Sequence, residues 1–108
     1  MSNIKIPVIK FKQSTSTDAV SNRIRVRAAN TAPAYDAPFV DIPKVTPDAD
    51  GYSRIPVSLV AQLTGVEGRR DVHLTAVDGV GNESDFLEID NQLFDLSPPA
   101  APTDGSVV

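Results

Sequence analysis

The amino-acid sequence predicts an all-β protein built from short antiparallel strands. Apolar and polar residues alternate along several runs, which is the pattern of strands that bury one face. Clusters of Pro, Gly, Asp, Asn and Ser separate these runs at regular spacing, as they do in a β-sandwich or a barrel. No segment keeps a helical period along its whole length. The 108 residues suit one domain with a single core.

Three strands are expected in the first part of the chain. Residues 4–11 form the first, and their alternation changes parity at Pro7, where a bulge or a kink is expected. Residues 23–29 form the second, with Ile, Val and Ala side chains facing inward and the arginines facing solvent. Residues 39–45 form a short third strand that is broken by prolines.

Residues 54–63 have the longest alternation in the chain and predict one long strand. Pro56 has no N–H to donate to a neighbouring strand, so this strand is expected at the edge of a sheet. The apolar residues expected on its inward face are Ile55, Val57, Leu59, Ala61 and Leu63.

Two further strands are expected in the second half of the chain. Residues 69–78 predict a strand on which His73 faces solvent, and residues 86–93 predict another. The residues expected to face inward in these two strands are Val72, Leu74, Ala76, Leu87 and Ile89.

The last stretch of the chain has a different composition. Residues 97–102 read SPPAAP, and such a proline-rich sequence favours an extended backbone. The sequence therefore predicts a folded domain over residues 1–96 and an extended arm or linker over residues 97–108.

One segment resembles a known family. Residues 75–84 read TAVDGVGNES, which resembles the sixth strand and the following loop of bacterial fibronectin type III domains. Leu63, with Gly65 and Gly68 after it, is similar to the family's leucine before the loop into that strand. The SPPAAP segment is similar to the start of a typical repeat. The resemblance implies an antiparallel two-sheet, immunoglobulin-like sandwich of about six or seven strands.

The chain also departs from that family. Arg70 stands where the family has its corner tyrosine, and the family's early tryptophan is absent. Counting back from residues 75–84 leaves no sequence for the family's first strand, although residues 97–102 are similar to the start of one. The chain therefore resembles a domain whose first strand has moved to its C-terminal end.

Composition and charge argue against several classes of partner. A net charge of −4 argues against nucleic-acid binding, since such proteins are normally basic. Cysteine is absent, which excludes disulfides, and a single histidine without thiols argues against a structural zinc site. No apolar run reaches the roughly 20 residues of a membrane span, and residues 1–12 lack the features of a signal peptide. We expect no nucleic-acid partner, no membrane insertion and no cofactor.

No combination of residues predicts catalysis or a metal site. His73 is the only histidine, and no serine motif, cysteine or second histidine accompanies it, so a solvated strand residue is expected. Several acidic residues in turns offer oxygen ligands to calcium, but acidic residues also favour turns through their own hydrogen bonds. These acidic residues are Asp48, Asp50, Asp78, Glu83 and Asp85.

Arg23, Arg25 and Arg27 form the one candidate binding site, a basic stripe on the outer face of their strand. Guanidinium groups suit a sulfated or phosphorylated polysaccharide, or an acidic edge of another protein. The alternative is pairing across strands with Asp71 and other neighbours.

We expect a non-catalytic structural or assembly protein that binds copies of itself or a larger particle, as a phage virion component or a cell-surface part does. Its arm would add a strand to the open edge at residues 4–11 of a neighbouring copy. The alternative is a spacer, or a carbohydrate- or protein-binding accessory domain, of a larger secreted protein. The arm residues behind the assembly expectation are Pro98, Pro99, Pro102, Val107 and Val108.

Overall fold

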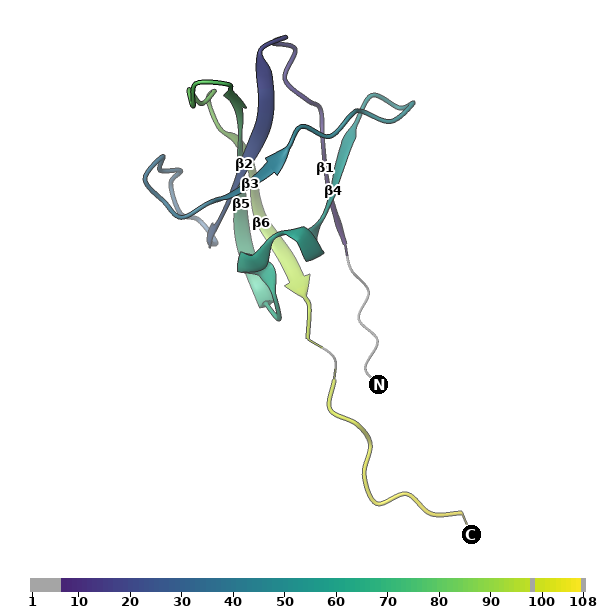
Figure 1. The fold of residues 1–108 in the computed structure, drawn as a ribbon. Coiled ribbons are helices and arrows are strands. Elements are labelled where there is room, and N and C mark those ends of the chain that lie inside the picture. The colour runs from purple at the N-terminus through teal and green to yellow at the C-terminus, as the bar shows by residue number, and fades with distance from the viewer. Residues whose placement is uncertain (1–6, 98, 108) are drawn as a thin grey trace.

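The computed structural model describes residues 7–97 and 99–107, and within these ranges the chain is all-β, as the sequence predicts (Figure 1). The strands are β1 (Val8–Phe11), β2 (Ala19–Ala28), β3 (Val40–Pro43), β4 (Ser53–Pro56), β5 (Glu67–Asp78) and β6 (Leu87–Asp95). Two short 3₁₀ turns, η1 (Val57–Leu59) and η2 (Ala61–Leu63), connect β4 to β5. No helix in the described ranges is long and apolar enough to cross a membrane.

The strands form two antiparallel sheets. β1 pairs with β4 in the smaller sheet, and the larger sheet has the order β3-β2-β5-β6. Side chains from both sheets meet in one core, so each sheet buries an apolar face. The smaller sheet contributes Ile9, Phe11 and Ile55 to this core, and the larger sheet contributes Ile24, Ile42, Val72, Leu74 and Phe94.

The prediction of one long strand around Pro56 is wrong, because β4 ends at this residue and the 3₁₀ turns begin. A 3₁₀ turn brings every third residue to the same side, and Val57, Val60 and Leu63 are accordingly buried. Leu59, which was expected to face inward, is 55% exposed. The expected position of Pro56 at an edge is confirmed, since it lies in a sheet of two strands in the described ranges.

The remaining strands lie close to the ranges that their alternation predicts. β1 covers the second half of the first expected strand, with Ile9 and Phe11 buried, and residues 4–6 lie outside the described residues. β2 and β5 are the longest strands and pair side by side in the centre of the larger sheet. Their outer face carries the arginines and His73.

The C-terminal arm leaves the end of β6 and points away from both sheets (Figure 1). Residues 99–107 are exposed and belong to no strand. Pro98 and Val108, two of the residues expected to matter for assembly, lie outside the described residues. Val107 is fully exposed, so at least one apolar side chain of the arm is available for contact.

Candidate functional site

Arg25 lies on the outer face of β2 and is fully buried. Its guanidinium donates to the two carboxylate oxygens of Glu83 at 2.8 and 3.2 Å. It also donates to the backbone carbonyls of Tyr35 at 2.8 Å and Ala37 at 3.3 Å. The prediction that Arg25 faces solvent is therefore wrong, although the side chain lies on the expected face of its strand.

The segment between β2 and β3 covers this face of the sheet. The Arg25 guanidinium carbon lies 5.0 Å from the centre of the Phe39 ring and 5.6 Å from that of Phe86, within the range of cation–π attraction. Tyr35 packs against Phe86 with ring centres 4.4 Å apart. Sequence reasoning missed this cover. The available signal was the largely apolar, aromatic composition of residues 29–39, which is unusual for a solvated loop.

The other two arginines of the expected stripe also have partners. Arg23 pairs with Asp41 at 2.9 Å and with Glu83 at 3.3 Å. Arg27 donates to the Ala32 carbonyl at 3.4 Å. The three arginines thus bind Glu83, Asp41 and the covering segment, and they do not present a continuous exposed stripe to a polymer.

Glu83 is the carboxylate that balances Arg25 and Arg23. The Thr75 hydroxyl also donates to it, at 2.7 Å. Burial alone would raise the pKa of Glu83, but the hydrogen bonds from Arg25 and Thr75 outweigh burial and lower the pKa below its ordinary value of 4.5. Glu83 therefore stays ionised at neutral pH, which suits a structural ion pair.

Acid is expected to weaken the fold partly through Glu83. The pKa of Glu83 is lower in the folded chain than in the unfolded chain. The stability that ionised Glu83 gives to the fold is therefore complete above the unfolded pKa, and it is lost as the pH falls through the folded pKa. Urea unfolding at a series of pH values should show a smaller acid-induced loss of stability for Glu83→Gln than for the natural chain. An equal loss in both chains would contradict this expectation.

His73 lies on the same outer face and is fully buried, so the prediction of a solvated histidine is wrong. Neither ring nitrogen has a hydrogen-bond partner among the described residues. A buried polar atom without a partner costs about 1–3 kcal/mol of stability. Oδ1 of Asp90 lies 3.5 Å from Nε2, which is too long for a hydrogen bond.

Asp71 and Asp90 form a group with His73, in which one potential ligand atom from each residue lies within 4.8 Å of the others. Asp71 and His73 are two residues apart on β5 and therefore share a face. Asp90 reaches them through a bulge, because β6 places Asp90 and Asn91 opposite the single residue Asp71. Asn91 has a φ of 54°, a left-handed conformation that asparagine tolerates better than most residues.

Backbone donors fix the carboxylate of Asp71. One oxygen accepts a hydrogen bond from the Asn91 N–H at 2.7 Å, and the other accepts one from the Thr31 N–H at 3.0 Å. The Asn91 N–H lowers the pKa of Asp71, and the two donors together outweigh the effect of burial. Asp71 is thus an ionised carboxylate, and it does not pair with the arginine stripe. The alternative of pairing across strands is confirmed for Arg23, which pairs with Asp41 on β3.

The acidic turn residues considered as calcium ligands have other partners. Asp48 and Asp50 each pair with Arg54 at 2.6 Å, and the hydrogen bond from Arg54 lowers the pKa of Asp50 to about 2. Asp78 accepts hydrogen bonds from backbone N–H groups in its own turn, as turn aspartates commonly do. Neither these residues nor Asp85 belong to a group of potential metal ligands within the described ranges.

A groove follows the open edge of β1, between the smaller sheet and β6, with a volume of about 290 Å³ beside residues 7–10. Among the described residues β1 pairs only with β4, so its other edge keeps unpaired backbone groups. Val8 and Leu93 line this part of the groove and are 47% and 67% exposed. The other apolar side chains that line it are Ile9, Val57, Val72, Ile89 and Phe94.

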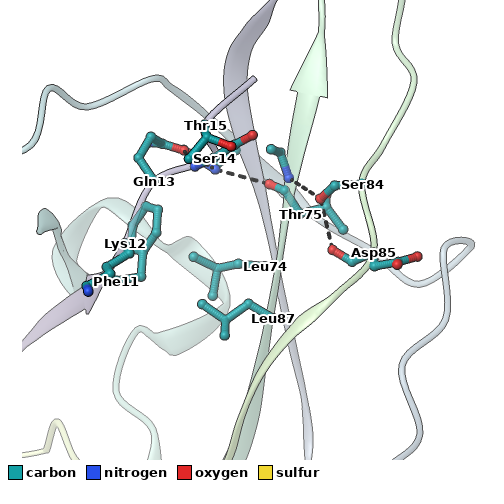
Figure 2. Close-up of a pocket in the computed structure, with 12 residues that line it drawn as sticks. Phe11, Lys12, Gln13, Ser14, Thr15, Leu74, Thr75, Ser84, Asp85 and Leu87 are labelled. Atoms are coloured by element: carbon teal, nitrogen blue, oxygen red, sulfur yellow. Dashed lines mark hydrogen bonds between the residues drawn. The ribbon is translucent and has the colours of Figure 1, made fainter. Parts of the chain in front are cut away.

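A second groove, of about 390 Å³, lies beside residues 11–15, which directly follow the residues that line the first. Figure 2 shows its apolar side chains, Phe11, Leu74 and Leu87, with Ser84 and other polar residues around them. Leu87 was expected to face inward; it lines the groove, but it is 45% exposed because no described strand covers it. We call the two grooves together the β1 groove; residues 7–15 form one wall, and β5 and β6 form the other.

Comparisons of this chain with protein-family models, with curated proteins and with solved structures gave no match. Function is therefore inferred from three features of the chain itself. These are the β1 groove, the exposed arm, and the buried side chains of Arg25 and His73 on the outer face of the larger sheet.

Proposed function

We propose that this chain is a non-catalytic assembly module with a fibronectin type III-like fold, in which the arm of a second copy supplies the first strand. The observation that carries the proposal is the β1 groove, which follows an unpaired strand edge and is mainly apolar beside residues 7–10. Beside residues 11–15 its lining is mixed, with apolar side chains at the base and polar ones around them. A strand added there would pair with β1 and cover Leu87 and Leu93. The resemblance of residues 75–84 to that family supports the fold in this proposal.

The direction of the chain favours a second copy as the donor. Residues 7–10, at the start of β1, line the groove together with Leu93 and Phe94, at the end of β6. The arm therefore leaves β6 beside the start of β1, and from there it could follow its own groove only parallel to β1. The strand pairs described here are antiparallel, and an antiparallel donor must enter at the opposite end, beside Thr15.

The composition of the arm suits this role. Pro99 and Pro102 stiffen its first part and disfavour an immediate turn back onto β6. Residues 105–108 would then supply the short pairing segment, with valine side chains for the apolar groove. Arm and groove are unlike surfaces, so a head-to-tail donation from one copy to the next is heterologous and generates rings or filaments.

Removal of residues 97–108 is expected to convert an oligomer of the full chain into a monomer, because it removes the donor strand and leaves residues 1–96. Light scattering of the two chains over a wide range of concentration measures this. A full-length chain that is monomeric at every concentration, or an oligomer that survives the truncation, contradicts the proposal. Either result favours the alternative, a spacer or a binding accessory domain of a larger secreted protein.

A matched pair of valine substitutions tests the groove itself. Val8 lines the β1 groove, so Val8→Lys places a charge in the path of the apolar donor strand and should abolish the oligomer. Val80 is 84% exposed in the turn between β5 and β6, outside the groove, so Val80→Lys should leave the oligomer intact. If the two variants behave alike, the β1 groove is not the assembly surface.

A further inference from the structure

We infer that Asp71, His73 and Asp90 bind a divalent transition-metal ion, with zinc as the best fit, at the bulge between β5 and β6. The three residues lie on the outer face of the larger sheet and do not line the β1 groove. The inference is therefore independent of the proposed assembly, and either can fail without the other.

The buried imidazole is the observation that points to a ligand. His73 is 0% exposed, and among the described residues neither of its nitrogens has a hydrogen-bond partner, whereas buried polar atoms normally have one. Its Nε2 lies 3.5 Å from Oδ1 of Asp90. Two ligands of a tetrahedral zinc ion, each about 2.0–2.2 Å from the metal, lie about 3.3–3.6 Å apart. The observed spacing fits two ligands of one ion.

Asp71 supplies the third ligand. Each of its oxygens accepts one backbone N–H, and a carboxylate oxygen keeps a further lone pair for a metal. Hydrogen bonds of this kind orient metal-binding carboxylates and are part of how such sites are built. Asp90 is exposed, so the ion has a path from solvent, and a water molecule would complete the tetrahedron.

The chemistry of the three side chains selects the class of ion. Two carboxylates balance the double positive charge of the ion, which a buried site requires. The imidazole nitrogen favours zinc and its neighbours in the first transition series over calcium and magnesium, which prefer oxygen ligands.

Zinc chloride is the probe, added to the untagged full chain while binding heat and thermal unfolding are measured. We expect saturable binding of one ion per chain and a rise in the unfolding temperature, because an ion that binds only the folded state stabilises it. Absence of saturable binding, or an unfolding temperature that zinc leaves unchanged, overturns the inference.

Asp90→Asn is the decisive variant, because this residue is exposed and its amide replacement should not disturb folding. We expect zinc affinity to fall at least about tenfold, as it does when the environment of a metal ligand is damaged. Asp95→Asn is the matched control, since it changes an exposed aspartate of the same strand outside the group and should bind zinc normally. Cobalt(II) gives a second readout, because its visible absorption reports tetrahedral coordination. Unchanged zinc affinity or an unchanged cobalt spectrum in Asp90→Asn would overturn the assignment.

Discussion

Substitution of Glu83 by alanine is expected to lower the free energy of unfolding by about 3–5 kcal/mol, the usual effect of leaving a buried charge unpaired. Arg25 is fully buried, and its guanidinium stays charged when its partner is removed. Its remaining hydrogen-bond partners are the neutral carbonyls of Tyr35 and Ala37. A loss of this size is a large part of the total stability of a small domain, about 5–15 kcal/mol. Equilibrium unfolding in urea provides the measurement.

Asp41→Ala is the matched control for Glu83→Ala. It also removes a carboxylate from an arginine of β2, but the Asp41 side chain is 49% exposed. Exposed pairs of this kind contribute only about 0.2–1 kcal/mol. If Glu83→Ala costs no more than Asp41→Ala, then Arg25 reaches solvent or a new partner, and the buried ion pair is not what holds the covering segment.

Substitution of Leu63 by alanine is expected to lower the free energy of unfolding by about 2–5 kcal/mol, because it leaves a cavity in the core. Leu63 is 0% exposed and packs with residues of both sheets. Leu59→Ala is the matched control, since Leu59 is 55% exposed and a change there should stay within about 0.5 kcal/mol.

The same pair of leucines distinguishes two local structures. A strand over residues 54–63 places both leucines on the inward face, whereas the 3₁₀ turns bury Leu63 and expose Leu59. Similar losses in urea unfolding for the two variants would therefore contradict the 3₁₀ turns and favour the strand.

The alternation of apolar residues predicted most of the strands, and it failed where two periods coincide. A period of two and a period of three both bring Val57 and Leu63 to the same side, because these residues are six apart. Val60 decides between them, since a strand turns it outward and a 3₁₀ turn buries it. Pro56 indicates an edge strand, and the strand also ends at this residue.

The candidate sites were harder to predict than the strands, because contacts between segments far apart in the sequence form them. Arg25 and His73 alternate with apolar residues, and polar residues in that position normally face solvent. Arg25 is covered by residues 29–39, whose sequence has no periodic signal. His73 lies beside Phe86 and Asp90, which come from another part of the chain. Asp90 comes close to His73 through a bulge that no spacing in the sequence indicates, so the proposed metal ligands were not predicted. The open edge at β1 was expected, because it follows from counting strands.

The smaller sheet gives the molecule an uneven distribution of local stability. β1 and β4 are held by four residue pairs, whereas β2 and β5 form nine. Short, one-sided pairings open before the centre of a domain does, through local unfolding that leaves the rest of the fold in place. In an isolated chain, β1 is therefore prone to transient detachment. A strand that pairs with its open edge would close this weak point, so association would also be the last step of folding.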